Sequence, residues 1–276
     1  MSTGPGFRTD DRVHSHAAKA AEYIAVDSFW SVRFLKEHVN RYAFASQFAK
    51  NKVVLDVACG IGYGTFLLKR SAQRVVGGEI RPEALSSAVL FFKDSGIDYV
   101  RLDAQRLPFS DNSFDVICSF ETIEHLPNYG GFLVECLRCL RSGGILLCST
   151  PNKTVSSPAS TRTSSGFHIH EFYPDELCDL VGEYFSVLEL YGQDPGRTRR
   201  GTAVARLAGA VKPYVMRVPG ARRFVNAVAR LTSWKDYALA RLSEIGVEDL
   251  IDDRFVPMPV PQDSPTPCII VVASKA

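Results

Sequence analysis

The sequence contains no apolar run that reaches the roughly 18 residues of a membrane-spanning helix. Its first residues include Arg8, Asp10 and Arg12, without the apolar stretch typical of a signal peptide. The seven cysteines are odd in number and lack the spacing of a disulfide framework, which is typical of a reducing compartment. These absences predict a cytoplasmic protein that would contact a membrane only peripherally.

The chain also lacks a strong overall charge, with a net charge of +2 over 276 residues. Ten Lys or Arg and no Asp or Glu fall between Gly196 and Lys235, so the remainder carries −8. Apolar residues recur there at helical intervals, which predicts an amphipathic basic stretch. It could contact a membrane surface, clamp an anionic or lipid-linked substrate, or pack as a lid. Only Tyr214, Phe224 and Trp234 offer stacking rings, which disfavours nucleic acid as a partner.

Apolar runs alternate with helical patterns over most of the chain, and there is no internal repeat. This alternation predicts an α/β fold: a Rossmann-like, doubly wound and mostly parallel sheet with an antiparallel final strand. N-terminal helices precede the sheet, and a helical insertion precedes the last strand. The predicted strands are 53–57, 74–78, 99–103, 114–120, 144–150, 184–190 and 268–273, and the predicted helices between them are 63–71, 82–95, 132–140 and 175–183.

Four segments follow from this pattern. Residues 1–50 are the N-terminal helical segment, and residues 51–192 are the ligand-binding Rossmann-like core. Residues 193–262 are the basic helical insertion or lid, and residues 263–276 carry the final core strand. A long insertion before a final strand is typical of a lid or side domain.

A glycine-rich turn follows the first predicted strand. Gly60, Gly62 and Gly64 lack the Gly-x-Gly-x-x-Gly spacing, which disfavours a dinucleotide. Asp56 suits a cationic ligand better than a phosphate. Ligands of open α/β sheets bind outside the carboxyl ends of the strands, so this turn is the predicted binding edge.

Two further carboxylates follow neighbouring strands. Glu79, at the end of the second strand, is placed to accept both hydroxyls of a ribose. Asp103, after the third strand, is placed to accept from an adenine amino group, with Ala104 offering its backbone N–H.

These motifs resemble the class I S-adenosylmethionine-dependent methyltransferases, in the same order over residues 50–192. The matching stretches are Leu55-Asp56-Val57-Ala58-Cys59-Gly60-Ile61-Gly62, Glu79, Asp103-Ala104 with Leu107-Pro108-Phe109, Ser113-Phe114-Asp115-Val116, and Arg141-Ser142-Gly143-Gly144-Ile145-Leu146-Leu147. One departure is Ala58, where the family more often has glycine. The resemblance implies S-adenosyl-L-methionine as cofactor, with contacts from Asp56, Ala58, Gly60, Gly62, Glu79, Ile80, Asp103, Ala104 and Phe120.

A cluster of candidate metal ligands follows the fourth strand. Glu121, Glu124 and His125 have the spacing i, i+3, i+4, which places them on one face of a helical turn. Spacing alone leaves two interpretations open. In the first, the three residues bind a divalent cation. In the second, one Glu caps a helix, the other is solvated and His125 closes the motif, as in many metal-free class I enzymes.

A second resemblance favours the metal. Small-RNA 2′-O-methyltransferases and ubiquinone-pathway O-methyltransferases pair Glu-x-x-Glu-His with a later His before an acidic-aromatic step. His168 precedes Glu171-Phe172 in the same way, which implies Glu121, Glu124, His125 and His168 as metal ligands. Mn²⁺ or Co²⁺ suits this set at least as well as Mg²⁺. The alternative for His168 and His170 is a loop pair bonded to backbone.

The predicted function is S-adenosylmethionine-dependent O-methylation of a sugar or glycoside hydroxyl, such as a polysaccharide or glycolipid precursor. His170 is the candidate general base, because the ordinary pKa of histidine suits neutral pH. The sugar substrate rests on His38-Val39-Asn40-Arg41-Tyr42, which resembles a segment of sugar and glycan methyltransferases. The alternatives are a quinone or phenol O-methyltransferase and a non-catalytic cofactor-binding protein that docks a membrane or partner. A homodimer is left open.

Overall fold

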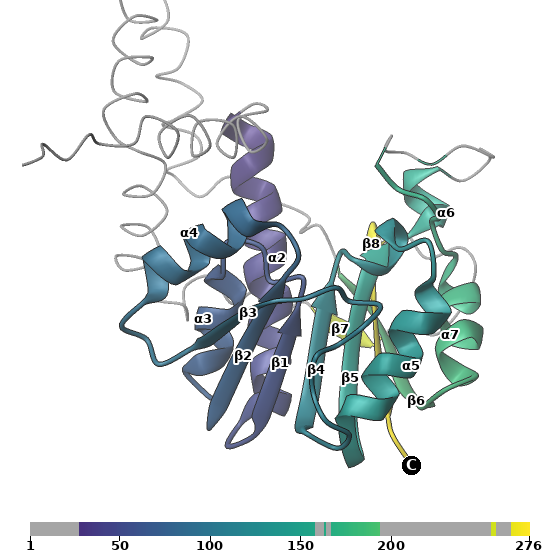
Figure 1. Cartoon of the computed structure of the whole chain (residues 1–276). Helices are drawn as coiled ribbons and strands as arrows, with labels where there is room; N and C mark the ends of the chain where they lie inside the picture. Colours follow the sequence, from purple (N-terminus) through teal and green to yellow (C-terminus); the bar gives the residue numbers. More distant parts are fainter. Residues whose placement is uncertain (1–27, 158–162, 164–166, 194–254, 258–265) are drawn as a thin grey trace, which may run out of the picture.

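The computed structural model describes residues 28–157, 163, 167–193, 255–257 and 266–276. These residues form one eight-stranded sheet flanked by helices (Figure 1). The basic stretch between Gly196 and Lys235 lies outside the described residues, as does the chain before Ser28. Among the described helices, none combines the length and the hydropathy needed to cross a membrane.

The sheet has the strand order β3-β2-β1-β4-β5-β8-β6-β7. Its strands are β1 (Val53–Val57), β2 (Arg74–Glu79), β3 (Asp98–Arg101), β4 (Phe114–Phe120), β5 (Leu140–Pro151), β6 (Ser186–Gln193), β7 (Phe255–Pro257) and β8 (Cys268–Ser274). Strands β1 to β5 are parallel, whereas β8 runs antiparallel to β5 on one side and to β6 on the other. This arrangement confirms the predicted mostly parallel sheet with an antiparallel final strand.

The described helices are α2 (Ser28–Ala49), α3 (Tyr63–Lys69), α4 (Pro82–Phe92), α5 (Tyr129–Cys139), α6 (Lys153–Ser156), α7 (Pro174–Gly182) and the 3₁₀ turn η1 (Ile123–His125). Helices α3, α4, α5 and α7 lie where the periodicity predicts them, with shifted ends, whereas α6 was not predicted. Helix α5 begins three residues earlier than predicted because the Asn128 side chain accepts a hydrogen bond from the Gly131 N–H at 2.9 Å. Strand β7 lies inside the predicted insertion, residues 193–262, and pairs with β6.

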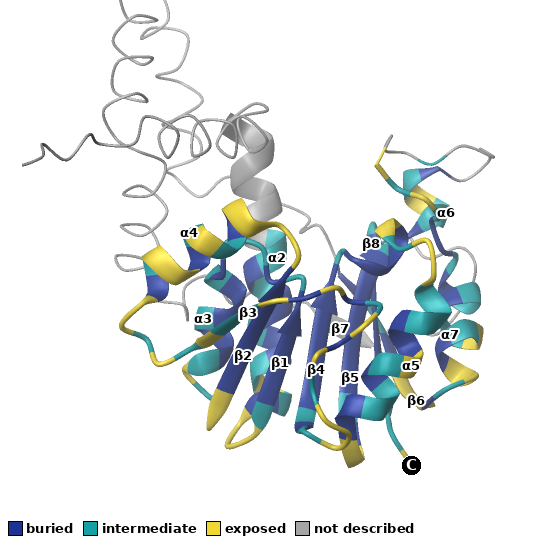
Figure 2. Ribbon diagram, viewed as in Figure 1, coloured by how far each residue is buried: buried dark blue, intermediate teal, exposed yellow. Residues whose placement is uncertain are grey.

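Two hydrophobic layers sandwich the sheet, because side chains alternate between its faces. On β1, Val54 packs in the layer with α2 and α3, whereas Leu55 packs in the layer with α5 and α7. Val116 and Ile117 of β4 divide in the same way. Figure 2 shows the strands buried along most of their length.

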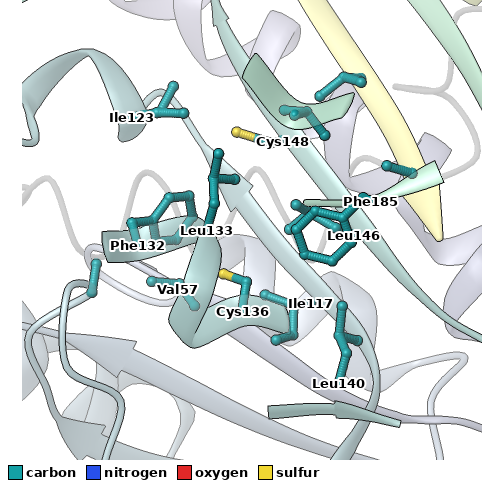
Figure 3. Close-up of a cluster of buried hydrophobic side chains, with 14 of the residues drawn as sticks. Val57, Ile117, Ile123, Phe132, Leu133, Cys136, Leu140, Leu146, Cys148 and Phe185 are labelled. Carbon is teal, nitrogen blue, oxygen red and sulfur yellow. The ribbon is translucent and has the colours of Figure 1, made fainter. Parts of the chain in front are cut away.

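The layer under α5 is the larger of the two (Figure 3). Phe132 and Cys136 of α5 lie against Ile117 of β4 and Leu146 of β5, and all four side chains are fully buried. Burial of a large apolar side chain contributes about 1.5–3 kcal/mol each. This packing fixes the strands whose carboxyl ends carry the candidate site.

The chain reverses its direction across the sheet between β1 and β4. It moves outward from β1 to β2 and β3, then returns to the other side of β1 as β4. Helix α2 packs at this point, where the Tyr42 ring meets the Phe120 ring edge-on at 5.0 Å between centroids. The turn after β1 and the segment after β4 therefore flank the topological switch point, where open α/β sheets bind ligands.

Candidate functional site

A turn with three positive φ angles follows β1. Ala58, Gly60 and Gly62 have φ of 60°, 60° and 86°. A Cβ atom on Gly62 would lie 2.6 Å from the Tyr99 hydroxyl and 2.8 Å from the Ala88 Cβ, so no larger residue fits. A Cβ atom on Gly60 would meet nothing within 4 Å. The Gly60 backbone therefore faces open space, as close approach of a ligand requires.

Glu79 ties the end of β2 to this turn. Its Oε2 accepts a hydrogen bond from the Gly60 N–H at 2.9 Å, and its Oε1 accepts from the Arg81 N–H at 2.9 Å. The Glu79 side chain is nearly fully buried. Glu79 Oε1 also accepts from the Arg81 Nε at 3.2 Å. A carboxylate has about four acceptor positions, so these three bonds leave capacity for one hydroxyl donor.

Asp56 lies beneath the turn and is fully buried. Its Oδ1 accepts from the Tyr42 hydroxyl at 3.1 Å and its Oδ2 from the Thr65 hydroxyl at 2.6 Å. Burial raises the pKa of Asp56 to about 7, although both hydroxyls favour the charged form. Asp56 therefore joins α2, β1 and α3 into one support for the turn.

The remaining predicted cofactor contacts lie along the same sheet edge. Ile80 directly follows β2 and is 53% exposed, which is unusual for a large apolar side chain next to a buried strand. Asp103 and Ala104 follow β3, where the Asp103 carboxylate accepts from the Gln105 N–H at 2.9 Å. Phe120 ends β4 and is buried against Tyr42.

Three predicted metal ligands from two distant segments converge. Glu124, His125 and His168 each offer a ligand atom, and these atoms lie within 4.8 Å of one another. Two backbone hydrogen bonds hold the segments together, since the Ile169 and His170 N–H groups both donate to the Glu124 carbonyl, at 2.8 Å and 3.2 Å.

The Nδ1 atoms of both cluster histidines are already engaged. His125 Nδ1 lies 2.9 Å from the Phe167 carbonyl oxygen, and His168 Nδ1 lies 2.8 Å from the Glu171 Oε1. Both rings thus have their Nε2 atoms available for a ligand. Metal-binding histidines commonly donate their other ring N–H to a carbonyl or carboxylate in this way.

The Glu124 carboxylate is buried, and one of its two oxygens has a hydrogen-bond partner in the described residues. Its Oε2 accepts from the Thr150 hydroxyl at 3.0 Å, whereas its Oε1 has no hydrogen-bond partner in the described part of the chain. Burial, and then the charge of Glu121, raise the pKa of Glu124 well above its ordinary value. A buried acceptor without a partner is costly, and a bound cation would satisfy it.

Glu121 is not brought into the group of Glu124, His125 and His168. Its Oε1 accepts from the Ser149 hydroxyl at 3.0 Å and from the Cys268 thiol at 3.4 Å. Glu121 also has a φ of 53°, an uncommon conformation for a residue with a side chain. The structure thus joins three of the four predicted ligands and leaves Glu121 beside them.

His170 lies apart from the cluster and has a carboxylate partner of its own. Its Nε2 is 2.7 Å from the Glu176 Oε1 on α7. The His170 ring packs at 4.4 Å, between centroids, from the Phe172 ring. The sequence did not reveal this partner.

Sequence reasoning also missed a buried cation, Arg41 of α2. Its Nη1 donates to the Gln193 Oε1 at 2.5 Å and to the Cys268 Sγ at 3.2 Å, both uncharged groups. Its Nε has no hydrogen-bond partner in the described residues. The only indication in the sequence was the resemblance of the segment from His38 to Tyr42 to sugar and glycan methyltransferases, and that resemblance did not single out Arg41.

Comparisons with known proteins show what the chain is similar to. Residues 55–148 match a family described as a methyltransferase domain. A Mycolicibacterium smegmatis protein described as an S-adenosylmethionine-dependent methyltransferase is 28% identical over 236 residues, 83% of this chain and 88% of the relative. A ubiquinone biosynthesis O-methyltransferase of Cereibacter sphaeroides is 30% identical over 145 residues, 46% of this chain and 57% of that enzyme.

A solved structure shows the same fold. The methyltransferase in a complex with the Haloferax volcanii Trm112 methyltransferase activator has a TM-score of 0.59 at 15% identity, with 96% of each chain covered. The solved structure shows the fold alone, whereas the matched domain and the relatives support a methyltransferase that uses S-adenosylmethionine. The protein is therefore a methyltransferase enzyme, with S-adenosylmethionine as its cofactor.

Proposed function

We propose that the protein is a divalent-metal-assisted O-methyltransferase that acts on a hydroxyl of a sugar or glycoside. The convergence of Glu124, His125 and His168, with ligand atoms within 4.8 Å of one another, carries this proposal. The cluster follows β4, next to the glycine-rich turn across the topological switch point. A metal-ligand set at this position suits chemistry on an oxygen acceptor.

The residues of the cluster fit a divalent cation such as Mn²⁺ or Mg²⁺. Glu124 would offer its Oε1, which has no hydrogen-bond partner in the described residues. His125 and His168 would offer their Nε2 atoms, because their Nδ1 atoms are engaged. A divalent cation supplies a lowered pKa for a hydroxyl group that it binds. Glu121 lies close enough to contribute charge, and we assign it a supporting role in the set.

The cofactor fits the other side of the switch point. S-adenosylmethionine supplies a methyl group on a sulfonium, next to an α-carboxylate and an adenosyl group. Gly60 offers bare backbone, and Glu79 has acceptor capacity left for a ribose hydroxyl. Arg41 is a buried cation with only uncharged hydrogen-bond partners in the described residues, so we assign it to the carboxylate. Ile80, Asp103, Ala104 and Phe120 remain the proposed contacts of the adenosyl group, with Asp56 and Ala58 supporting the turn.

Proton removal from the acceptor is assigned to His170. Glu176 orients the imidazole through Nε2, which leaves Nδ1 to accept a proton. A carboxylate partner also stabilises the imidazolium that forms. Holding both reactants in line would supply much of the remaining rate enhancement.

One observation favours a second acceptor class, a quinone or phenol. Phe167 and Ile169 flank His168 and are 67% and 58% exposed, so apolar side chains border the cluster. An aromatic acceptor would bury this surface, whereas a sugar would need polar partners. Membrane contact through residues 193–262 and a homodimer stay predictions, because the basic stretch lies outside the described residues.

Methyl transfer to a panel of free sugars, methyl glycosides, catechols and hydroquinones tests the proposal. We expect turnover with sugars or glycosides that falls at least tenfold when a chelator is added and returns with Mn²⁺. Turnover restricted to the phenols would establish the second class instead. Turnover that is indifferent to the chelator would contradict the role of the metal.

A further inference from the structure

The Glu171 carboxylate is a buried acceptor for several groups around the cluster. Its Oε1 lies 2.8 Å from His168 Nδ1, and its Oε2 accepts from the Ser156 hydroxyl at 3.2 Å and from the Ser157 hydroxyl. The Glu171 side chain has no exposed surface. These contacts join α6, the loop of His168 and the start of the α7 segment.

We propose that Glu171 is a positioning residue that sets the tautomer and the orientation of His168. An ionised carboxylate can only accept, so the proton of a neutral His168 must lie on Nδ1. The Nε2 lone pair is then available for a ligand, on a histidine whose ligand atom lies within 4.8 Å of those of Glu124 and His125. This inference rests on the proposed function only where it concerns metal binding; the tautomer follows from the hydrogen bond to an ionised Glu171.

A comparison with the neighbouring histidine supports a specific role. His170, two residues further, also meets a glutamate, but through Nε2 and with a Glu176 side chain that is 41% exposed. His168 meets a carboxylate with 0% exposure through Nδ1. A charge–dipole contact is stronger in a buried setting, because water does not screen it. The contact with Glu171 therefore leaves Nε2 of His168 available, whereas the contact with Glu176 leaves Nδ1 of His170 available.

The Nδ1–H tautomer of His168 in metal-free protein is the first test. Nitrogen-15 NMR of the histidine rings, assigned with a His168→Gln variant, reports which nitrogen carries the proton. We expect the Nδ1–H form in the wild type and in Glu176→Gln, the matched control. Glu171→Ala should shift His168 toward the Nε2–H form. A wild-type His168 with its proton on Nε2 would overturn the proposal.

Mn²⁺ affinity, measured by electron paramagnetic resonance, is the second test. We expect Glu171→Ala to weaken Mn²⁺ binding about 10–100-fold, the usual effect of losing such a partner. Glu171→Gln keeps an acceptor oxygen without the charge, so its Mn²⁺ affinity should fall by a smaller factor, about three- to tenfold, and it should keep the Nδ1–H form. It also serves as the test variant if the alanine variant does not fold.

The outcomes separate this inference from the proposed function. A wild type that shows the Nδ1–H form but binds no Mn²⁺ would contradict the metal-assisted function and leave the positioning of His168 standing. A wild type that binds Mn²⁺ while both Glu171 variants keep its affinity within twofold would overturn the positioning role.

Discussion

The glycine-rich turn and the cluster of Glu124, His125 and His168 face the same switch point, but they are built in different ways. The turn uses consecutive residues from Ala58 to Gly62, and backbone conformation shapes it. The cluster joins His125 to a segment about forty residues further along, and side-chain hydrogen bonds such as that of His125 to the Phe167 carbonyl shape it. A backbone-built site is robust to most side-chain changes outside it, whereas a site built from side chains depends on each of its partners.

The two regions also differ in their effect on stability. Packing supports the turn, since Tyr99 and Ala88 leave no room for a side chain at Gly62, and Glu79 bonds to Gly60. The cluster instead holds the buried Glu124, whose Oε1 has no hydrogen-bond partner in the described residues. Groups that weaken the folded state commonly mark sites kept for function. The cluster is therefore where we expect activity and stability to move in opposite directions.

Replacing Glu124 with Gln should have the largest effect, because it should impair the cluster and leave the glycine-rich turn intact. We expect methyl transfer to fall at least about 100-fold, because metal stabilisation of the reacting oxygen is worth several kcal/mol. S-adenosylhomocysteine should bind with its wild-type affinity, measured by calorimetry. Metal-free Glu124→Gln should melt above the wild type at pH 8, since burial disfavours the charged carboxylate.

Glu189→Gln is the control for this change, because Glu189 is an exposed carboxylate on β6. Its activity and melting temperature should match the wild type. A Glu124→Gln variant that keeps full activity, or that loses cofactor binding together with activity, would contradict a separate metal region.

Two glycine substitutions test the turn as a matched pair. Gly62→Ala should destabilise the protein by about 3 kcal/mol, because the methyl group meets Tyr99 and Ala88 in a strained conformation. Gly60→Ala has the same kind of strain but no close contact, so it should cost about 1 kcal/mol. Urea denaturation measures both. Gly60→Ala should nevertheless weaken S-adenosylhomocysteine binding, because its methyl group fills the open side of the turn. Equal losses of stability would contradict the packing described for Gly62.

The pH dependence of stability should reveal Asp56 beneath the turn. Its pKa is raised from 3.8 to about 7 in the folded protein, so the folded state holds the proton more tightly than the unfolded state. The contribution of Asp56 to stability is therefore full below about pH 4 and is lost as the pH rises to about 7. The free energy of unfolding of Asp56→Asn, relative to that of the wild type, should rise across this window by on the order of 2–4 kcal/mol. Denaturation curves at several pH values measure this difference. Parallel pH profiles would contradict this assignment.

The smallest expected effect is at Ala58, which has a φ of 60°. Glycine adopts this conformation without strain, so Ala58→Gly should stabilise the protein by about 1 kcal/mol. For a chain of this length that corresponds to about 2–4 °C in melting temperature, measured by calorimetric scanning. A lower melting temperature would show that the alanine methyl group makes contacts that outweigh the strain.

The sheet could be predicted from the sequence because local patterns of apolar residues indicate its main strands. The predicted bounds of β1, Val53–Val57, and of β4, Phe114–Phe120, are those observed. Both strands are short apolar runs between clear breaks, and the glycine turn follows directly. Helix α6 was missed because it is a single turn, too short for a periodic pattern.

The partners of the site residues could not be predicted, since they depend on which segments the fold brings together. Arg41 donates to Gln193, 152 residues away, and no local pattern indicates that pair. Glu171 served only as a landmark for His168, although its buried carboxylate is the group that His168 contacts. Glu121 has the expected spacing, but its bonds to Ser149 and Cys268 depend on β5 and β8.

Calorimetric titration of Mn²⁺ into the complex with S-adenosylhomocysteine tests the central proposal most directly. Wild type and Glu124→Gln should bind S-adenosylhomocysteine equally, and only the wild type should then bind one Mn²⁺ ion with a released proton. Cofactor binding without any Mn²⁺ binding in the wild type would contradict metal assistance and leave a methyltransferase that relies on His170 as its base.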